Sequence, residues 1–226
     1  MKRSRINQLQ REALALFAEH RFALPSFATW SEADWRSAPE AASYCLAHQM
    51  GWDITDFGSG DFTRRGLVIF CVRNGIQGVE GERPYAEKLL VVRENQETPY
   101  HSHRIKMEDI IVRGGGNLVL ELRNMSDGKL DDSPVTVIVD GSRRVLQSGS
   151  PLRLQPGESV TLPRNLWHRF YGEAGQGTVF VGEVSQVNDD LSDNYFAEVL
   201  GRFAEVEEDE ARLFPLWNEL AQLGPA

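Results

Sequence analysis

The sequence predicts a mainly β protein, an antiparallel β-barrel or sandwich with helices at both ends. Between about residues 66 and 187, short runs rich in Val, Ile and Leu alternate with Gly, Asn and Asp, which is typical of strands joined by turns. Before about residue 50, apolar residues recur instead with helical spacing. A chain of 226 residues can form one substantial domain, and we expect a single domain over residues 1–226.

The N-terminal extension, residues 1–50, is predicted to be helical. Residues 6–18 form an amphipathic pattern, because their apolar side chains fall on one face of a helix. Thr29 or Ser31 is the expected N-cap of a second helix, since acidic residues follow in its first turn. A third helix is predicted in residues 38–50, ending at Gly51.

The barrel core is predicted over about residues 66–187, preceded by a loop in residues 52–66. Its strands are expected in the Val-, Ile- and Leu-rich segments 66–75, 87–95, 107–116, 117–124, 135–141, 150–172 and 177–188. Segment 150–172 contains two strands, with a turn at 163–165. About residues 188–226 are predicted to form a C-terminal helical segment, interrupted by Pro215.

The composition of the chain argues against several classes of function and partner. The formal charge of −9 argues against a nucleic-acid partner, because such binding depends on Lys and Arg that neutralise phosphates. The sequence lacks a run of about 18 apolar residues, so we expect no membrane span. Two cysteines, Cys45 and Cys71, give no disulfide framework, and the basic N-terminus lacks the apolar stretch of a signal peptide. We therefore expect a cytoplasmic protein with a small-molecule ligand.

The stretch "PYHSHRIKMED" suggests a metal site. His101 and His103 point to the same side of an extended strand, and imidazole is a common metal ligand. Glu108 has the opposite parity, so it can join them only if the chain bends and Glu108 begins a neighbouring strand. His168, after the second predicted turn, supplies a third imidazole. This nitrogen and oxygen set suits Mn, Fe, Co, Ni or Zn. A lone His-x-His pair also fits surface or capping histidines.

The full spacing resembles the two motifs of the cupin superfamily. Residues 101–115 match H-x-H-x4-E-x6-G, and residues 157–168 match G-x5-P-x-N-x2-H. The sequence departs from the motifs at Asn95, Asn165 and Gly172, none of which is a ligand; Asn tolerates the left-handed turn conformation. The resemblance implies the cupin double-stranded β-helix, an antiparallel barrel. A cupin whose histidines are structural is the alternative.

Longer segments of the sequence indicate one family within this superfamily. "LPSFATWSEADW", "GWDITDFGSGDF", "GLVIFCVRNG", "LPRNLWHRFYGE" and "GEVSQVNDDLSDNYF" resemble the D-lyxose isomerase family of cupins over nearly the whole chain. The resemblance implies a homodimeric, Mn2+-dependent aldose–ketose isomerase that interconverts D-lyxose with D-xylulose and, more weakly, D-mannose with D-fructose. Co2+, Fe2+ or Zn2+ are chemically possible instead of Mn2+.

Isomerisation moves a proton between C1 and C2, so basic and acidic side chains beside the metal matter. Lys106 lies between the ligands and can stabilise negative charge or carry a proton; otherwise it is a solvated turn residue. Glu183 continues an apolar strand face as a predicted proton-transfer group, and the ligand Glu108 could also accept a proton. Lys88 and Asp193 are candidate substrate-binding residues, although a strand-edge lysine and a loop cap are their ordinary roles.

Trp167, beside His168, is a further candidate for substrate binding, with core packing as the alternative. Two other functions remain open. An iron-dependent cupin dioxygenase would use the same ligands but would need oxygen. A non-catalytic sugar-binding cupin would use the same fold without turnover, because fold alone does not give function.

Overall fold

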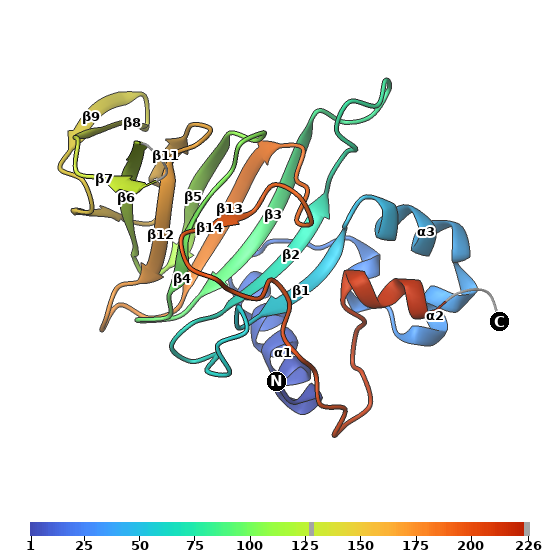
Figure 1. Ribbon diagram of the computed structural model, residues 1–226. Coiled ribbons are helices and arrows are strands. Elements are labelled where there is room, and N and C mark those ends of the chain that lie inside the picture. The colour runs from blue at the N-terminus through green and yellow to red at the C-terminus, as the bar shows by residue number, and fades with distance from the viewer. Residues whose placement is uncertain (127–128, 224–226) are drawn as a thin grey trace.

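A computed structural model describes residues 1–126 and 129–223 and confirms the mainly β fold (Figure 1). Two antiparallel sheets curl toward each other as a half-open barrel. In spatial order, the larger sheet contains β1 (Gly51–Thr55), β2 (Leu67–Arg73), β3 (Tyr85–Val92), β13 (Val179–Gln186), β5 (Glu108–Gly115), β11 (Ser159–Leu162), β8 (Val135–Val139) and β9 (Ser142–Leu146). The smaller sheet contains β10 (Pro151–Leu154), β6 (Leu118–Ser126), β12 (Trp167–Gly172), β4 (Thr98–Ser102) and β14 (Tyr195–Phe196), while β7 (Lys129–Asp131) pairs with β6.

The N-terminal residues form the three predicted helices. These are α1 (Arg3–Glu19), α2 (Glu32–Ser37) and α3 (Pro39–Ala47), with a 3-10 turn η1 (Ser26–Thr29) between the first two. Ser31, not Thr29, is the N-cap of α2. Its hydroxyl accepts from the Asp34 backbone N–H, and the Asp34 carboxylate accepts from the Ser31 N–H, which is a capping box. None of the helices in the described part of the chain is long and apolar enough to cross a membrane.

The larger sheet is buried on both faces at β2 and β3. Its inner face packs inside the barrel through residues such as Leu90 and Ile110. Its outer face packs on α1 through residues such as Phe70 and Phe17. Strands covered on both sides have no solvent-facing positions, so they are apolar at successive residues. This explains the uninterrupted runs "LVIFCV" and "KLLVV" in the sequence.

Two segments differ from prediction. The segment 52–66 was expected to be a loop, but its beginning belongs to β1, which pairs with β2 and is buried throughout. The strand was not predicted because it contains the polar residue Asp53, which is untypical of a buried strand. The Asp53 carboxylate is buried because it pairs with Arg202, which lies far along the chain.

The C-terminal segment is the second difference. Its one described helix is the 3-10 helix η2 (Trp217–Leu223), and residues 205–212, predicted to be helical, have no helix. The backbone there bonds to α1 instead: Asn7 Nδ2 donates to the Ala211 carbonyl, and Gln10 Nε2 donates to the Phe214 carbonyl. These bonds replace the helical ones. Residues 224–226 of the predicted segment lie outside the described residues.

The first residues of the chain pair with residues 205–207, in the segment that passes beside α1 on its way to η2 (Figure 1). The Arg3 N–H donates to the Glu207 carbonyl at 2.8 Å, and the Glu207 N–H donates to the Met1 carbonyl at 2.9 Å. The Arg3 guanidinium is fully buried between Glu208 and Glu219. The C-terminal segment is therefore held against α1 before it returns to η2.

Candidate active site

The four predicted ligands come from both sheets. His101 on β4 lies directly opposite His168 on β12 within the smaller sheet. His103 follows the end of β4, and Glu108 is the first residue of β5. β5 belongs to the larger sheet, so Glu108 faces the histidines across the barrel and is not on a neighbouring strand as predicted. The intervening residues 104–107 connect the two sheets.

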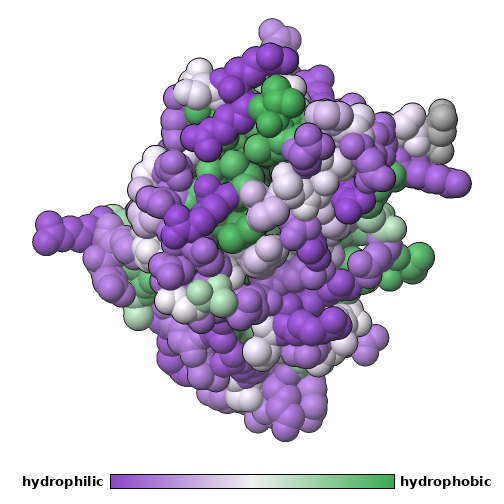
Figure 2. All heavy atoms as spheres, turned by 90° about the vertical axis from the view of Figure 1, so that its left-hand side faces the viewer, coloured by the Kyte–Doolittle hydropathy of each residue, from purple (hydrophilic) through white to green (hydrophobic). Residues whose placement is uncertain are grey.

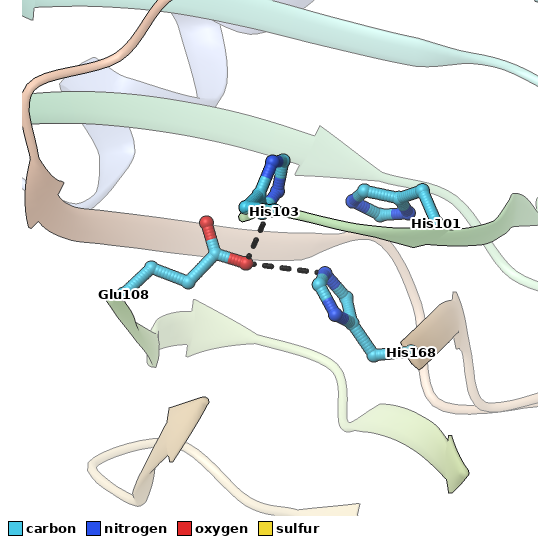
Figure 3. Close-up of side chains that lie close together, drawn as sticks. All are labelled: His101, His103, Glu108 and His168. Carbon is cyan, nitrogen blue, oxygen red and sulfur yellow. Dashed lines mark ion pairs between the residues drawn. The ribbon is translucent and has the colours of Figure 1, made fainter. Parts of the chain in front are cut away.

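The structure brings these four side chains together (Figure 3). One ligand atom of each lies within 4.8 Å of the others, and all four residues are buried. Glu108 Oε1 is 3.1 Å from His168 Nε2 and 3.6 Å from His103 Nε2. The turn before His168 forms as expected, with Asn165 in the left-handed region at a φ of 63°.

Backbone carbonyls fix the orientation of all three imidazoles. Each Nδ1 contacts a carbonyl oxygen, which pairs His101 with Pro99 (2.8 Å), His103 with Asp193 (2.7 Å) and His168 with Leu166 (3.1 Å). A carbonyl only accepts, so each Nδ1 carries the proton and each Nε2 offers a lone pair.

His101 and His103 are held in the neutral form that binds metals. Burial, together with the ammonium of Lys106, lowers the pKa of His103 to about 3. Burial and the neighbouring His168 also hold the pKa of His101 well below its usual range.

A divalent cation fits this arrangement. The lone pairs of three imidazole nitrogens and one carboxylate oxygen converge on the same point. They repel one another, and a cation bound between them would stabilise the cluster. Within the described residues, His168 Nε2 is buried and has no hydrogen-bond partner. The donor set suits several divalent transition metals and does not choose among them.

A row of alternating charges extends from this cluster. Lys106 Nζ lies 2.9 Å from Glu108 Oε2 and 2.7 Å from Glu183 Oε1. Lys88 Nζ lies 3.8 Å from the same Glu183 oxygen. The Asn188 side-chain oxygen accepts from both lysines. All of these groups are buried, so the carboxylates and ammonium groups compensate one another without solvent.

These pairs keep both ligating and non-ligating groups ionised. Burial opposes the charge on Lys106, but Glu108 and Glu183 outweigh it and raise the pKa of the ammonium above its usual value. Burial likewise opposes the charge on Glu108, but Lys106 and His103 hold the pKa of that carboxyl well below its usual range.

One cavity contains most of the predicted site. Polar and charged residues line it together with apolar residues such as Phe57 and Phe196. The predicted site residues among its lining are His101, His103, Lys106, Glu108, Lys88 and Glu183.

Asp193 and Trp167 have other positions. The Asp193 carboxylate lies beneath the connection between the sheets and accepts from the backbone N–H groups of Arg104, Ile105 and Lys106. Trp167 lies opposite Arg123 in the register of β12 and β6, on the other face of β12 from His168.

Two charged residues of the cavity lining, Asp190 and Arg202, were not among the predicted site residues. Arg202 Nη2 lies 3.2 Å from Asp190 and also binds Asp53. The signal that could have found Arg202 is the buried aspartate of β1, which needs a cation that its own strand does not supply.

Comparison of folds identifies related architectures. The L-ribose isomerase of Acinetobacter sp. DL28 in complex with L-ribose superposes with a TM-score of 0.62 at 16% identity, covering 92% of this chain and 98% of that one. The L-ribose isomerase of Cellulomonas parahominis with L-psicose gives a TM-score of 0.53 at 19% identity, over 78% and 96% of the two chains. At these identities the similarity establishes the fold alone.

Sequence relatives are much closer. The D-lyxose/D-mannose isomerase of Escherichia coli O157:H7 is 46% identical over 225 residues, which cover 98% of this chain and 99% of the relative. The protein of the same name from Serratia proteamaculans is also 46% identical, over 97% of each chain. The sequence profile described as D-lyxose isomerase matches residues 1–220. This chain therefore belongs to the D-lyxose isomerase family and is an aldose–ketose isomerase.

Proposed function

We propose that this enzyme interconverts D-lyxose with D-xylulose, and D-mannose with D-fructose, with Mn2+ held by His101, His103, Glu108 and His168. The observation that carries the proposal is the Lys106–Glu183 ion pair beside the four-ligand cluster in one cavity. Relatives named D-lyxose/D-mannose isomerase, 46% identical to this chain, support the choice of sugars. The two aldoses share the configuration at the reacting carbons.

The bound metal would supply Lewis-acid stabilisation of negative charge on the sugar oxygens. The protein must provide the proton transfer. Glu183 is the proposed base, because both of its ion pairs are made through Oε1. None of the hydrogen bonds and ion pairs among the described residues involves Oε2, which leaves this oxygen for the substrate. It accepts the proton from C2 of the aldose and returns it to C1, while the hydroxyl proton of O2 passes to O1, so that the aldehyde at C1 becomes a hydroxymethyl group and C2 becomes the ketone.

Lys106 has a different proposed role. Its ammonium lies between Glu108 and Glu183, within hydrogen-bond distance of both. It donates to the sugar oxygen on which negative charge develops, and its ion pair with Glu183 Oε1 holds that carboxylate in place for the next proton transfer. Burial strengthens this interaction, because water does not screen it.

The test uses metal-stripped protein incubated with D-lyxose and D-mannose, with and without added Mn2+, in air and under anaerobic conditions. We expect Mn2+ to restore ketose formation from both sugars equally in the presence and absence of oxygen. D-Xylose, which differs in configuration at C2, is the control aldose. Ketose formation that needs oxygen, or no Mn2+-stimulated ketose from either sugar, would contradict the proposal.

We further propose that the chain is one domain and acts as a cytoplasmic homodimer. The resemblance to the family supports the dimer. The β8–β9 hairpin exposes Ile138 and Val145, and Figure 2 shows apolar side chains gathered between hydrophilic ones on the side of the molecule where this hairpin lies. Light scattering should give twice the mass of the 25.5 kDa chain. A monomer at working concentration would contradict the dimer.

A further inference from the structure

The proton-transfer groups occupy only one end of the charged side of the cavity. Starting from the metal-ligand candidate Glu108, ion pairs connect seven residues of alternating sign. In order, they are Glu108, Lys106, Glu183, Lys88, Asp190, Arg202 and Asp53. The first three residues have a role in the proposed reaction, as a metal ligand, a hydrogen-bond donor and a base. Lys88, which the sequence indicates as a substrate-binding candidate, lines the cavity together with Asp190 and Arg202, and the proposed proton transfer uses none of the three.

Two of these distal residues carry N–H groups without a protein partner. Arg202 Nη1 is buried and has no hydrogen-bond partner in the described part of the chain. Lys88 has one hydrogen bond, to Asn188, and its other ion-pair distances are 3.6 Å to Asp190 and 3.8 Å to Glu183. Buried donors in native proteins are ordinarily satisfied, so these face a missing acceptor.

A second lining residue has an orphaned polar atom, Thr98 Oγ1. It is on β4, three residues before His101, and so belongs to the imidazole side of the cavity. A hydroxyl can also rotate toward different partners, whereas the guanidinium is a planar group with fixed N–H directions. Arg202 is therefore the more specific indication of a ligand.

Arg202 is held firmly in position. Its Nη2 binds Asp53, on β1, and Asp190, in the segment after β13. These two carboxylates fix one edge of the guanidinium and leave Nη1 free. Asp190 in turn contacts Lys88 at 3.6 Å, so the donors and the acceptor form one rigid group.

We propose that Arg202, together with Lys88 and Asp190, binds the distal hydroxyl groups of the sugar, the end remote from C1 and C2. This inference rests on the proposed function. C1 and C2 must lie beside Glu183 and Lys106 for proton transfer, so the remaining carbons extend along the row of charges. Sugar hydroxyls accept from the free N–H groups and donate to the Asp190 carboxylate, which identifies Arg202 as a specificity-determining residue.

The test removes the distal hydroxyl from the sugar and the guanidinium from the enzyme. Turnover is measured for D-lyxose and 5-deoxy-D-lyxose. Binding is measured by calorimetry for the two alditols obtained by reducing these sugars, which have no ring form and cannot be isomerised. Each pair is compared in the wild type, in Arg202→Met and in Arg202→Lys. The lysine variant retains a positive charge for Asp53 and Asp190 if the methionine variant does not fold.

Arg65→Met is the matched control. Arg65 binds Glu198 in the same C-terminal segment but is not among the residues that line the cavity. We expect loss of the hydroxyl to reduce wild-type kcat/KM and affinity at least about tenfold. This loss caused by removing the hydroxyl should shrink to about twofold or less in both Arg202 variants. It should stay at the wild-type value in Arg65→Met.

If an Arg202 variant loses affinity or kcat/KM by the same factor for the hydroxylated and the deoxy compound, the tenfold ratio stays unaltered. That result would overturn the inference, because a purely structural role weakens both alike. Alditols that do not bind to the wild type would overturn it as well. Absence of turnover with a preserved difference in alditol binding would contradict the proposed reaction and support the distal site.

Discussion

At Glu183 a carboxylate is buried between the ammonium groups of Lys88 and Lys106, although it belongs to an apolar strand face. The preceding inward residues, Val179 and Val181, are fully buried in the barrel core. A buried carboxylate requires charge compensation, and here the two lysines that provide it come from other elements of the fold. Its position beside the cavity and not deeper in the core is what makes it available for chemistry.

Replacing Glu183 with Gln should nearly abolish turnover. The amide keeps the size of the side chain but cannot accept a proton, so kcat should fall about 10³-fold while KM changes less than about threefold. The measurements are kcat and KM with D-lyxose, together with metal content per chain, which should be unchanged.

Glu121→Gln is the control for that substitution. Glu121 on β6 binds Arg169 and Tyr100, outside the cavity. Its kcat should stay within about twofold of wild type. A Glu183→Gln enzyme with kcat within tenfold of wild type would exclude this residue as the base.

Individual site residues were predictable where chemistry left a local pattern. The spacing of His101, His103, Glu108 and His168 indicated one cluster, and the structure assembles it. Arg202 has no local pattern. Its position depends on an ion pair with β1, and the sequence does not reveal such a long-range pair.

At the level of elements, the connection between β4 and β5 is the most constrained segment near the site. It carries the chain from one sheet to the other and holds Lys106. The Asp193 carboxylate accepts from three successive backbone N–H groups in it, and the Asp193 carbonyl fixes His103. Asp193 thus positions both the candidate ligand His103 and the segment that carries Lys106.

Asp193→Ala should reduce both stability and activity. Three backbone donors lose their acceptor, so we expect a loss of about 2–4 kcal/mol in the free energy of unfolding and at least about a tenfold fall in kcat. Urea denaturation and steady-state kinetics are the measurements. Asp193→Asn, which keeps a side-chain oxygen acceptor, should recover part of both.

A neighbouring aspartate provides the comparison. Asp189 accepts from Ser192, Gln49 and the Leu191 N–H in the same segment but is partly exposed. Asp189→Ala should cost less than about 1 kcal/mol and leave kcat nearly unchanged. Equal effects of the two alanine variants would show that Asp193 has no special positioning role.

Elements were predictable from sequence when their pattern was local. The strands β2 and β3 and the helix α1 were evident from apolar runs and helical spacing. The acidic residues 205–212 favoured a helix by propensity alone, but the Glu207 and Ala211 carbonyls in this segment accept hydrogen bonds from α1. Tertiary contacts therefore override local preference in that segment.

At the scale of the whole molecule, α1 joins the barrel to the C-terminal segment. It packs on the outer face of the larger sheet through Phe17 and binds the C-terminal segment along its other side through Asn7 and Gln10. The Arg3 guanidinium makes two 2.8 Å hydrogen bonds to Glu208 and also binds buried Glu219. Loss of this contact would affect the entire C-terminal segment.

Arg3→Met should destabilise the protein by about 3–5 kcal/mol, because it leaves the buried Glu219 carboxylate without its cation. Arg11→Met is the control: Arg11 and Glu210 are 3.9 Å apart and both about half exposed, so the change should be within about 0.5 kcal/mol. Urea denaturation measures both. An Arg3 variant as stable as the Arg11 variant would refute the importance of the buried pair.

The pairing of residues 1–3 with residues 205–207 also has a consequence for how the protein is synthesised. All four candidate metal ligands and Glu183 precede Arg202 in the chain, so they emerge from the ribosome first. Residues 205–207 then pair with residues 1–3, which are translated much earlier. The charged lining of the cavity is thus completed only after the candidate metal ligands have been translated, and a chain that stopped before Arg202 would carry those ligands without the Arg202 end of the row of charges.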